Sequence, residues 1–335
     1  MKKHIVGIDL GSSSTLIWIS TQDNVIFNEP TVLAWSKKQE KIIEIGYLAH
    51  KLIGKAPEDI DIIFPIKNGV VADEKAATDY LSTAFKNLHI EKEVKGSVFI
   101  FSVPSDITKV EKKALAQVSL ALGAKDMILV DSAKASAIGS GLDINSTRGN
   151  MTVDIGGSRT NIATLAMGRL VVSKSINYAG TSVDEAIVRY VRTKSHLLIG
   201  PKTAEYVKMK IGTLLDNPDN NLLEISGRDA LSGLPHSIIV STEEISEIIV
   251  KIYSEIANAI VETLEISPAE ISADIIHTGI TISGGGCLLN GAREFFTKKL
   301  SVPVHISPYP LESTIQGIKQ EADRLISEPS LGISY

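Results

Sequence analysis

Two hydrophobic periodicities alternate along the chain, and together they predict an α/β fold. Short apolar runs typical of buried strands occupy residues 4–10, 97–104 and 127–131. Segments with apolar residues three and four positions apart lie between such runs, and this is the spacing of a helix with one buried face. The longest of these segments follows Ser241, where a stripe of isoleucines predicts a core helix.

Capping residues place the starts of several helices. Thr108 and Ser241 each precede a glutamate by three residues, which is the pattern of a capping box. Asp131 is expected to cap a short helix of small residues that follows it. Ser267 and Pro268 predict another helix, with the serine at the N-cap and the proline at the first helical position.

One pattern of residues occurs twice, at positions 145 residues apart. Asp9 ends an apolar strand and leads through a Gly/Ser loop into a second strand, and Asp154 does the same. A repeat of this length indicates a duplicated domain rather than a solenoid, whose repeats are about 20–50 residues long. Two similar halves that face each other would form a cleft between them.

The two Gly/Ser loops have the composition of an anion-binding turn. Glycine permits positive φ and a close backbone approach, so successive N–H groups can surround a phosphate. Asp9 and Asp154 could hold Mg²⁺ through its water shell. Each loop alone is more typical of an ordinary hairpin, but their recurrence in one register favours ligand binding. The run Gly284–Gly286 fits either a nucleoside contact or a tight strand-to-helix turn.

Composition and charge limit the class of protein further. A chain of 335 residues, 44% hydrophobic and 22% charged, is typical of a folded protein of about two domains. A net charge of −5 and only 5% aromatic residues argue against a nucleic-acid partner. The single cysteine, Cys287, excludes an internal disulfide and fits a reducing cytoplasm. The amino end lacks a signal-peptide pattern, and no apolar run reaches the ~20 residues of a membrane span.

Other common signatures are missing from the sequence. It contains neither the P-loop pattern G-x-x-x-x-G-K-[ST] nor the hydrolase pattern G-x-S-x-G. Its seven histidines show no metal-binding spacing.

Three motifs together resemble those of the actin, Hsp70 and sugar-kinase superfamily. VGIDLGSSST resembles its phosphate-1 motif, the loop after Asp154 its phosphate-2 motif, and SGGGCLLNG its adenosine motif. Further segments narrow the resemblance to the bacterial actin MreB family, and the similarity covers essentially all of the chain. These segments are EPTV (29–32), PIKNGVVADE (65–74), VPSDITKVEKKAL (103–115), LGAKDMILVD (122–131), SAIGSGL (136–142), GNMTVDIGG (149–157), VDEAIVRYVR (183–192) and LIGPKTAEYVKMKIG (198–212).

The resemblance implies an actin-like α/β fold, in which two RNase H-like halves and four subdomains surround a cleft for ATP or ADP with Mg²⁺. It also implies polymerisation of the protein with itself into filaments, paired and antiparallel, that act in cell shape or in the motility of a wall-less cell. The expected subdomain boundaries are 1–30, 66–143 and 310–335 for IA, 31–65 for IB, 144–181 and 243–309 for IIA, and 182–242 for IIB.

The family's motifs also assign site residues in this chain. Asp9 and Asp154 would hold Mg²⁺ through water, and Glu205 and Lys208 would contact the nucleotide. Without the resemblance, an exposed ion pair on a helix is the simpler interpretation of Glu205 and Lys208. The remaining nucleotide-binding positions are Gly11, Ser12, Ser13, Ser14, Thr15, Gly156, Gly157, Ser158, Gly284, Gly285 and Gly286.

Two residues depart from the family pattern at positions that act on the attacking water. Ser132 stands where the family has a glutamate and Arg159 where it has a threonine, while Thr160 is retained and is expected to substitute in part. A serine hydroxyl is a poor base and arginine accepts no proton, so we expect ATP binding with slow hydrolysis. The alternative is a soluble small-molecule kinase of the same superfamily, which would need a catalytic carboxylate in place of Ser132.

An apolar pair gives a separate expectation about the membrane. Leu88 and Ile90 lie where some MreB proteins have an apolar membrane-binding loop. The resemblance therefore implies a cytoplasmic protein with these side chains against the inner membrane face. Packing of the same two residues at a helix end is the alternative.

Overall fold

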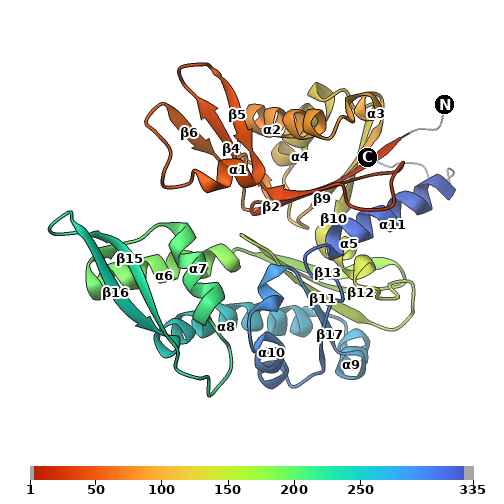
Figure 1. Ribbon diagram of the computed structural model, residues 1–335. Helices are drawn as coiled ribbons and strands as arrows, with labels where there is room; N and C mark the ends of the chain where they lie inside the picture. Colours follow the sequence, from red (N-terminus) through yellow and green to blue (C-terminus); the bar gives the residue numbers. More distant parts are fainter. Residues whose placement is uncertain (1–3, 328–335) are drawn as a thin grey trace.

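Two five-stranded sheets of one topology form the centre of the fold. The computed structural model describes residues 4–327, and Figure 1 shows one sheet in each of two halves. The strand order is β10-β9-β1-β2-β3 in the first sheet and β13-β12-β11-β17-β18 in the second. The first consists of β1 (Ile5–Leu10), β2 (Ser14–Ile19), β3 (Phe27–Pro30), β9 (Val98–Val103) and β10 (Asp126–Asp131). The second consists of β11 (Asn150–Ile155), β12 (Thr160–Ala166), β13 (Arg169–Ile176), β17 (Ile280–Ser283) and β18 (Val304–Ile306).

Strand pairing confirms the duplication that the sequence repeat predicts. β1 is parallel to β9 and antiparallel to β2, just as β11 is parallel to β17 and antiparallel to β12. Asp9 is the fifth residue of β1, and Asp154 is the fifth residue of β11. The two acids therefore occupy equivalent positions, each near the carboxyl end of a central strand.

Helices bury the apolar faces of both sheets. α2 and α4 pack on the first sheet around Tyr80, Phe99 and Phe101, of which Phe99 and Phe101 belong to β9. α8 packs on the second sheet through the predicted isoleucine stripe, of which Ile249 and Ile256 are fully buried. The helices of these layers are α2 (Glu74–Asn87), α3 (Glu91–Val94), α4 (Lys109–Ala121), α8 (Thr242–Ile266), α9 (Ala269–Thr278) and α10 (Ala292–Leu300).

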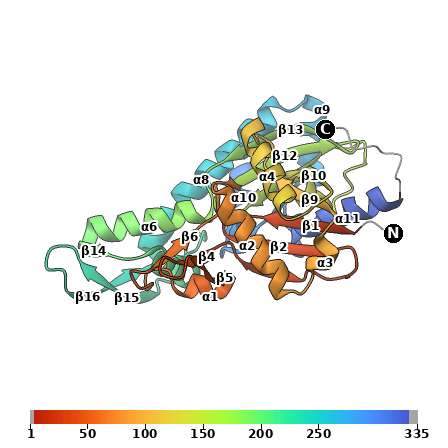
Figure 2. The same cartoon turned by 90° about the horizontal axis from the view of Figure 1, so that it is seen from above.

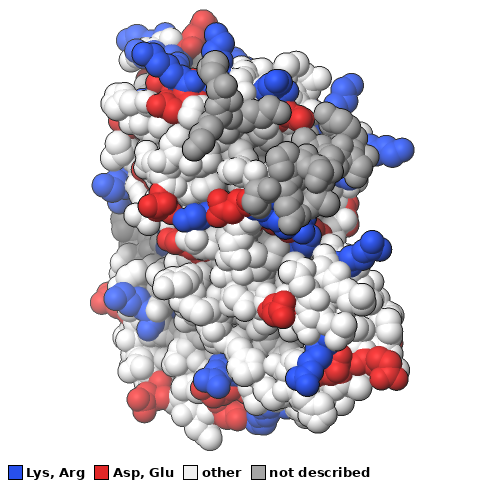
Figure 3. All heavy atoms as spheres, turned by 90° about the vertical axis from the view of Figure 1, so that its right-hand side faces the viewer, with Lys and Arg blue, Asp and Glu red and all other residues white. Residues whose placement is uncertain are grey.

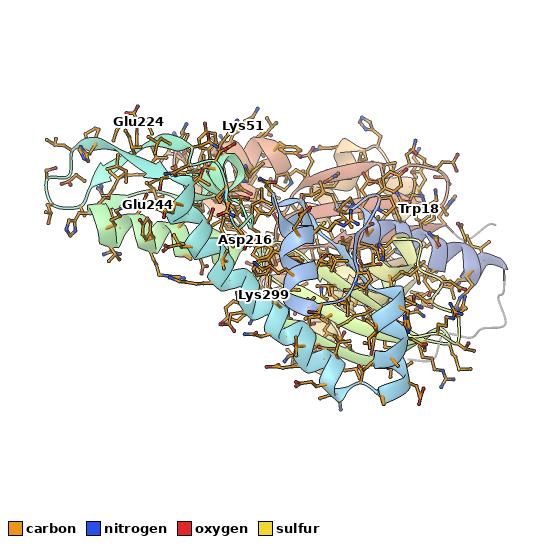
Figure 4. The ribbon with its side chains drawn as sticks, turned by 90° about the horizontal axis from the view of Figure 1, so that it is seen from below. Trp18, Lys51, Asp216, Glu224, Glu244 and Lys299 are labelled. Carbon is orange, nitrogen blue, oxygen red and sulfur yellow. The ribbon has the colours of Figure 1, made fainter. Side chains whose placement is uncertain are left out.

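A smaller sheet extends from each half at the same end of the molecule. Figures 1 and 2 show both extensions at one end, and Figure 4 places Glu224 of the β15 hairpin far from Trp18 of β2. The first-half extension has β4 (Leu33–Ser36), β5 (Lys41–Ile45), β6 (Ile60–Ile63) and α1 (Gly46–Lys51), followed by the hairpin β7 (Ile66–Lys67) and β8 (Val70–Val71). The other has α6 (Gly180–Ser195), β14 (Leu197–Leu198), α7 (Pro201–Ile211), β15 (Leu222–Asp229) and β16 (Pro235–Ser241).

The capping predictions are confirmed at three helices and wrong at a fourth. Thr108 and Ser241 each form a capping box, and Asp131 accepts hydrogen bonds from the first N–H groups of the helix that follows it. Ser267 does not cap α9, because that helix begins at Ala269 with Pro268 at its N-cap. The Ser267 hydroxyl instead donates to the Thr263 carbonyl at 2.7 Å, at the end of α8.

A close crossing of two helices joins the halves. α5 (Ser132–Gly139) follows β10 of the first sheet, and α11 (Ser313–Ser327) follows β18 of the second. A Cβ at Gly139 would lie 1.8 Å from the Ser313 carbonyl oxygen, and one at Gly317 would lie 1.8 Å from the Ala135 carbonyl oxygen. Only glycine permits this backbone contact, which fixes how the two sheets face each other.

The surface carries charges of both signs. On the face shown in Figure 3, Lys and Arg side chains are interspersed with Asp and Glu. Within residues 4–327, no helix is long and apolar enough to cross a bilayer.

The helix crossing generates the first prediction. Gly139→Ala is expected to lower the free energy of unfolding by about 2–3 kcal/mol, because the added methyl group has no space. Guanidinium denaturation measures this loss. Gly200→Ala is the matched control, since a Cβ there meets no atom within 4 Å, and its loss is expected to stay below about 1 kcal/mol. Equal losses in the two variants would contradict the constraint.

Candidate functional site

The cleft between the two halves forms a cavity with a volume of about 590 Å³. Both halves contribute to its walls. The first glycine loop (residues 11–14) and the second glycine loop (residues 156–159) line it, together with α7 and the triple glycine Gly284–Gly286. Its lining therefore includes most of the residues that the sequence assigns to nucleotide binding. This volume is typical of a small-molecule site.

Two buried carboxylates form the floor of the cleft. Ser102 Oγ donates to Asp9 Oδ1 at 2.6 Å, and Ser283 Oγ donates to Asp154 Oδ1 at 3.3 Å, so each acid has a serine partner on the neighbouring parallel strand. Burial raises the pKa of Asp9. Burial first, and then the negative charge of Asp9, raise the pKa of Asp154 to about 7. Two acids that face each other in a buried site favour a bound cation.

The two glycine loops have matching turns and touch each other across the cleft. Gly11 N donates to the Ser14 carbonyl at 3.0 Å, and Gly156 N donates to the Arg159 carbonyl at 2.9 Å. The hydroxyls of Ser12 and Ser158 lie 2.8 Å apart. Gly157 packs so closely on the first loop that a Cβ there would lie 2.6 Å from the Ser13 Cβ. The shape and donors of these loops fit phosphate oxygens.

The threonine side chains after the two loops do not line the cleft, contrary to the sequence-based assignment. Thr15 is fully buried and shares a 2.8 Å hydrogen bond with the Thr31 hydroxyl. Thr160 is also fully buried, and its hydroxyl donates to the Tyr178 carbonyl at 2.7 Å. Thr15 is the second residue of β2 and Thr160 the first of β12, and side chains alternate between the two faces of a strand, so both point away from the cleft. The Thr160 hydroxyl therefore points away from the cleft, and the expectation that it substitutes near the attacking water is wrong.

α7 contributes charged side chains to the cleft. Glu205 and Lys208 of α7 both line it. Lys208 Nζ lies 2.8 Å from Asp184 Oδ1 and donates to the Gly180 carbonyl at 3.2 Å. Burial raises the pKa of Asp184 to about 6, although Lys208 lowers it. Sequence reasoning missed Asp184, because its partner lies on another helix, 24 residues away.

The triple glycine allows close backbone packing against β11 beside Asp154. Gly284 has φ of +78°, and a Cβ at Gly286 would lie 2.2 Å from the Ile155 Cγ2. Tyr253 of α8 donates its hydroxyl to the Gly286 carbonyl at 2.7 Å, and it was also missed from the sequence. Residues Gly285–Leu288 form a 3-10 turn after β17, and the next α-helix, α10, begins at Ala292.

The two residues that depart from the family pattern lie in the cleft, but in different ways. Ser132 lines the cleft, whereas the Asp131 carboxylate caps α5 and accepts a hydrogen bond from Ser105 at 2.5 Å. Arg159 reaches across to the first half, where its guanidinium lies 2.5 Å from the Asp106 carboxylate and 3.2 Å from the Asn68 carbonyl. Asp131 is thus no replacement for a carboxylate at position 132.

The apolar pair proposed for the membrane is packed inside the protein. Ile90 is buried in the core between α2 and the first sheet, and Leu88 packs against the same cluster at the end of α2. The alternative of helix-end packing therefore accounts for both residues. Membrane contact through this pair, as expected from the resemblance, does not agree with these positions.

The buried acid pair generates the second prediction. With a folded pKa of about 7 against an ordinary 3.8, Asp154 makes the folded state bind more protons, so stability falls as pH rises through this window. Without Mg²⁺ and nucleotide, Asp154→Asn is expected to raise the free energy of unfolding at pH 8 on the order of 3 kcal/mol. Guanidinium denaturation at pH 5 and pH 8 should show the gain over wild type widening with pH. The exposed Asp61→Asn is the control. If the stability of Asp154→Asn relative to wild type changes with pH no more than that of Asp61→Asn, the raised pKa of Asp154 is contradicted.

The duplicated halves and the acid-floored cleft between them define an actin-like protein. The MreB/Mbl protein family model matches residues 3–328. The chain belongs to the MreB/Mbl family.

Individual relatives match nearly the whole chain. The cell shape-determining protein Mbl of Bacillus subtilis (strain 168) is 36% identical over 329 residues, which are 98% of each chain. The cell shape-determining protein MreB of Escherichia coli (strain K12) is 32% identical over 93% of this chain and 91% of its own. MreB5 of Spiroplasma citri bound to AMPPNP superposes with a TM-score of 0.94 at 34% identity, covering 99% of this chain and 100% of that one. The MamK double helical filament shares the fold, with a TM-score of 0.79 at 20% identity, over 96% of this chain and 99% of its own.

Proposed function

We propose that this protein binds ATP with Mg²⁺ in the cleft and polymerises into filaments that act in cell shape. The observation that carries the proposal is the pair of glycine loops above the buried acids Asp9 and Asp154. A related structure, MreB5 of Spiroplasma citri, is described as bound to AMPPNP and another as bound to ADP. The Mbl and MreB relatives are called cell shape-determining proteins.

The residues present fit a magnesium nucleotide. The loops supply backbone N–H groups and the hydroxyls of Ser12 and Ser158 for phosphate oxygens. Asp9 and Asp154 would hold Mg²⁺ through its water ligands, since carboxylate oxygens suit this cation. The bound cation would neutralise the two facing carboxylates and the phosphates together. Glu205, Lys208 and the triple glycine would contact the nucleoside.

We further propose the four-subdomain division inferred from the resemblance. Ranges 31–65 and 182–242, assigned to IB and IIB, each contain one of the two small sheets, which supports this division. Residues 1–3 and 328–335 of the ranges assigned to IA lie outside the described part of the chain. Self-association along filaments, paired and antiparallel, and residence in the cytoplasm complete the proposal.

The kinase alternative lacks a catalytic group. Among the cleft-lining residues that the structure describes, the carboxylates are Asp9, Asp154 and Glu205, and none stands at Ser132. A general base for transfer to a substrate hydroxyl would need such a group. The cleft therefore favours nucleotide binding coupled to assembly.

Hydrolysis is expected to be slow in this cleft. Ser132 is 8% exposed and brings a neutral hydroxyl, and the Arg159 guanidinium is tied to Asp106. Neither group can take a proton from an attacking water at neutral pH. Loss of such a group typically costs about 10²- to 10⁴-fold in rate.

Assembly provides the third prediction. ATP with Mg²⁺ should increase light scattering and produce filaments in electron micrographs. Gly157→Ala should lose nucleotide affinity by at least about tenfold, because its methyl group would meet Ser13 and narrow the phosphate site. It should therefore assemble poorly, whereas Gly200→Ala should assemble as wild type does. A wild-type protein that remains monomeric with nucleotide and phosphorylates a metabolite would favour the kinase alternative.

Hydrolysis provides the fourth prediction. The double variant Ser132→Glu/Arg159→Thr restores the family's residues and is expected to release phosphate about 10²-fold faster or more. Each single variant is an internal control and should show a smaller gain in the rate of phosphate release, because the glutamate would position the water and the loss of the arginine would make room for it. A double variant that hydrolyses ATP no faster than wild type, yet binds it, would show that these two positions do not limit the rate.

A further inference from the structure

Arg159 links the two halves beside the two glycine loops of the cleft. It follows Ser158 of the second glycine loop, yet its guanidinium pairs with Asp106 and with the Asn68 carbonyl of the first half. Asn68 and Gly69 form the turn of the β7–β8 hairpin. Gly69 donates its N–H to Ser12 Oγ of the first glycine loop at 2.9 Å. Loops and hairpin therefore form one contact network around the arginine.

One donor of Arg159 is left without a partner in this network. The Arg159 side chain is only 14% exposed, and within residues 4–327 its buried Nε–H has no hydrogen-bond partner. Leaving a buried charged donor unpaired is unfavourable, and an arginine N–H is a strong donor to phosphate oxygens. Arg159 also lines the cleft, so its positive charge lies beside a phosphate bound there, and the five N–H donors of its guanidinium exceed the two contacts in use.

The charges of the cleft also favour an anion at Arg159. Among the described lining residues, the Lys and Arg side chains are Lys208 and Arg159. Lys208 pairs with Asp184, whose side chain is 14% exposed, whereas the partner of Arg159, Asp106, is 53% exposed. Water screens the exposed carboxylate, so Arg159 retains more attraction for a second anion.

Asp106 fixes where the guanidinium can act. Both terminal nitrogens of Arg159 are used on the first half, so the side chain cannot swing into the solvent without breaking two contacts. The backbone of Gly69, with φ of +72°, passes so close that a Cβ would lie 3.2 Å from the Arg159 Cδ. The arginine is thus preorganised beside both glycine loops, and a preorganised donor binds its ligand at a smaller entropic cost.

We propose that Arg159, held by Asp106, is a ligand for the terminal phosphate of a bound nucleoside triphosphate and makes the cleft select a triphosphate over a diphosphate. The inference rests on the proposed nucleotide binding and extends it. Where the family's threonine would act on water, this chain has a cation that retains the terminal phosphate. Arg159 is the ligand, and Asp106 is a positioning residue that acts through it.

Calorimetric titration with AMPPNP and with ADP, both with Mg²⁺, tests the assignment. Arg159→Thr is expected to weaken AMPPNP binding by about 10- to 100-fold and ADP binding by less than about threefold. Asp106→Asn should shift the ratio of the two affinities in the same direction by about 3- to 10-fold. Arg159→Lys keeps the charge but loses the Nε–H, and should recover only part of the preference. Asp106→Asn should add little in the Arg159→Thr background, since it acts through the arginine.

Matched controls separate this effect from a general loss of charge or fold. Arg169→Thr removes an exposed arginine at the start of β13, and Asp61→Asn removes a carboxylate that pairs with Lys37 at 2.9 Å outside the cleft. Both should leave the AMPPNP-to-ADP affinity ratio unchanged, and melting without nucleotide should show every variant folded. If Arg159→Thr misfolds, Arg159→Lys and Asp106→Asn carry the test alone.

The outcomes distinguish this inference from the proposed function. If wild type binds both nucleotides but the Arg159 and Asp106 variants leave the affinity ratio unchanged, the pair is only a bridge between the halves and the inference is wrong. If the variants weaken AMPPNP and ADP equally, the contact is not to the terminal phosphate and the inference is again wrong. If wild type binds neither nucleotide, the proposed function fails, and the inference fails with it.

Discussion

The close contact of α5 with α11 is the constraint on which the cleft depends. Each helix follows the equivalent edge strand of a different half, so their crossing sets how the carboxyl ends of the two sheets face each other. Gly139 and Gly317 permit backbone contact at this crossing, and Lys134 pairs across it with the nearly buried Glu321 at 3.1 Å. Because Ser132 of α5 and Thr314 of α11 both line the cleft, small changes at the crossing would alter how the walls of the cleft face each other.

This arrangement concentrates negative charge at the floor of the cleft. Asp9 and Asp154 come together through the duplication, and burial raises the pKa of both. The two lining cations that the structure describes are each paired with another carboxylate, Lys208 with Asp184 and Arg159 with Asp106. A divalent cation with a polyphosphate would balance this charge, and the same ligand would contact both halves at once. Ligand binding and closure of the halves are then linked by the same charges.

The fold and the position of the cleft could be predicted from the sequence, the repeated units because they are local patterns and the actin-like arrangement because the motifs resemble those of a known family. The repeated strand-Asp-loop unit places Asp9 and Asp154 at equivalent strand ends. The capping boxes at Thr108 and Ser241 each lie within one helical turn. The cross-cleft pair of Arg159 with Asp106 joins residues 53 positions apart in different halves, so no local pattern shows it. Local patterns also do not show where a side chain points. Thr160 turns into the core, and Ile90 packs inside the protein rather than facing a membrane.

We propose that Ser132 and Arg159, which stand where the family pattern has a glutamate and a threonine, leave a cleft that binds ATP but hydrolyses it slowly. Filaments should then persist long after they have assembled. The most direct test is the number of phosphates released per assembled subunit, measured by phosphate release and sedimentation on one sample with ATP and Mg²⁺. The account predicts a ratio well below one when assembly reaches its plateau, with the filaments persisting. A ratio near one at the plateau, or filaments that disassemble in step with phosphate release, would contradict it.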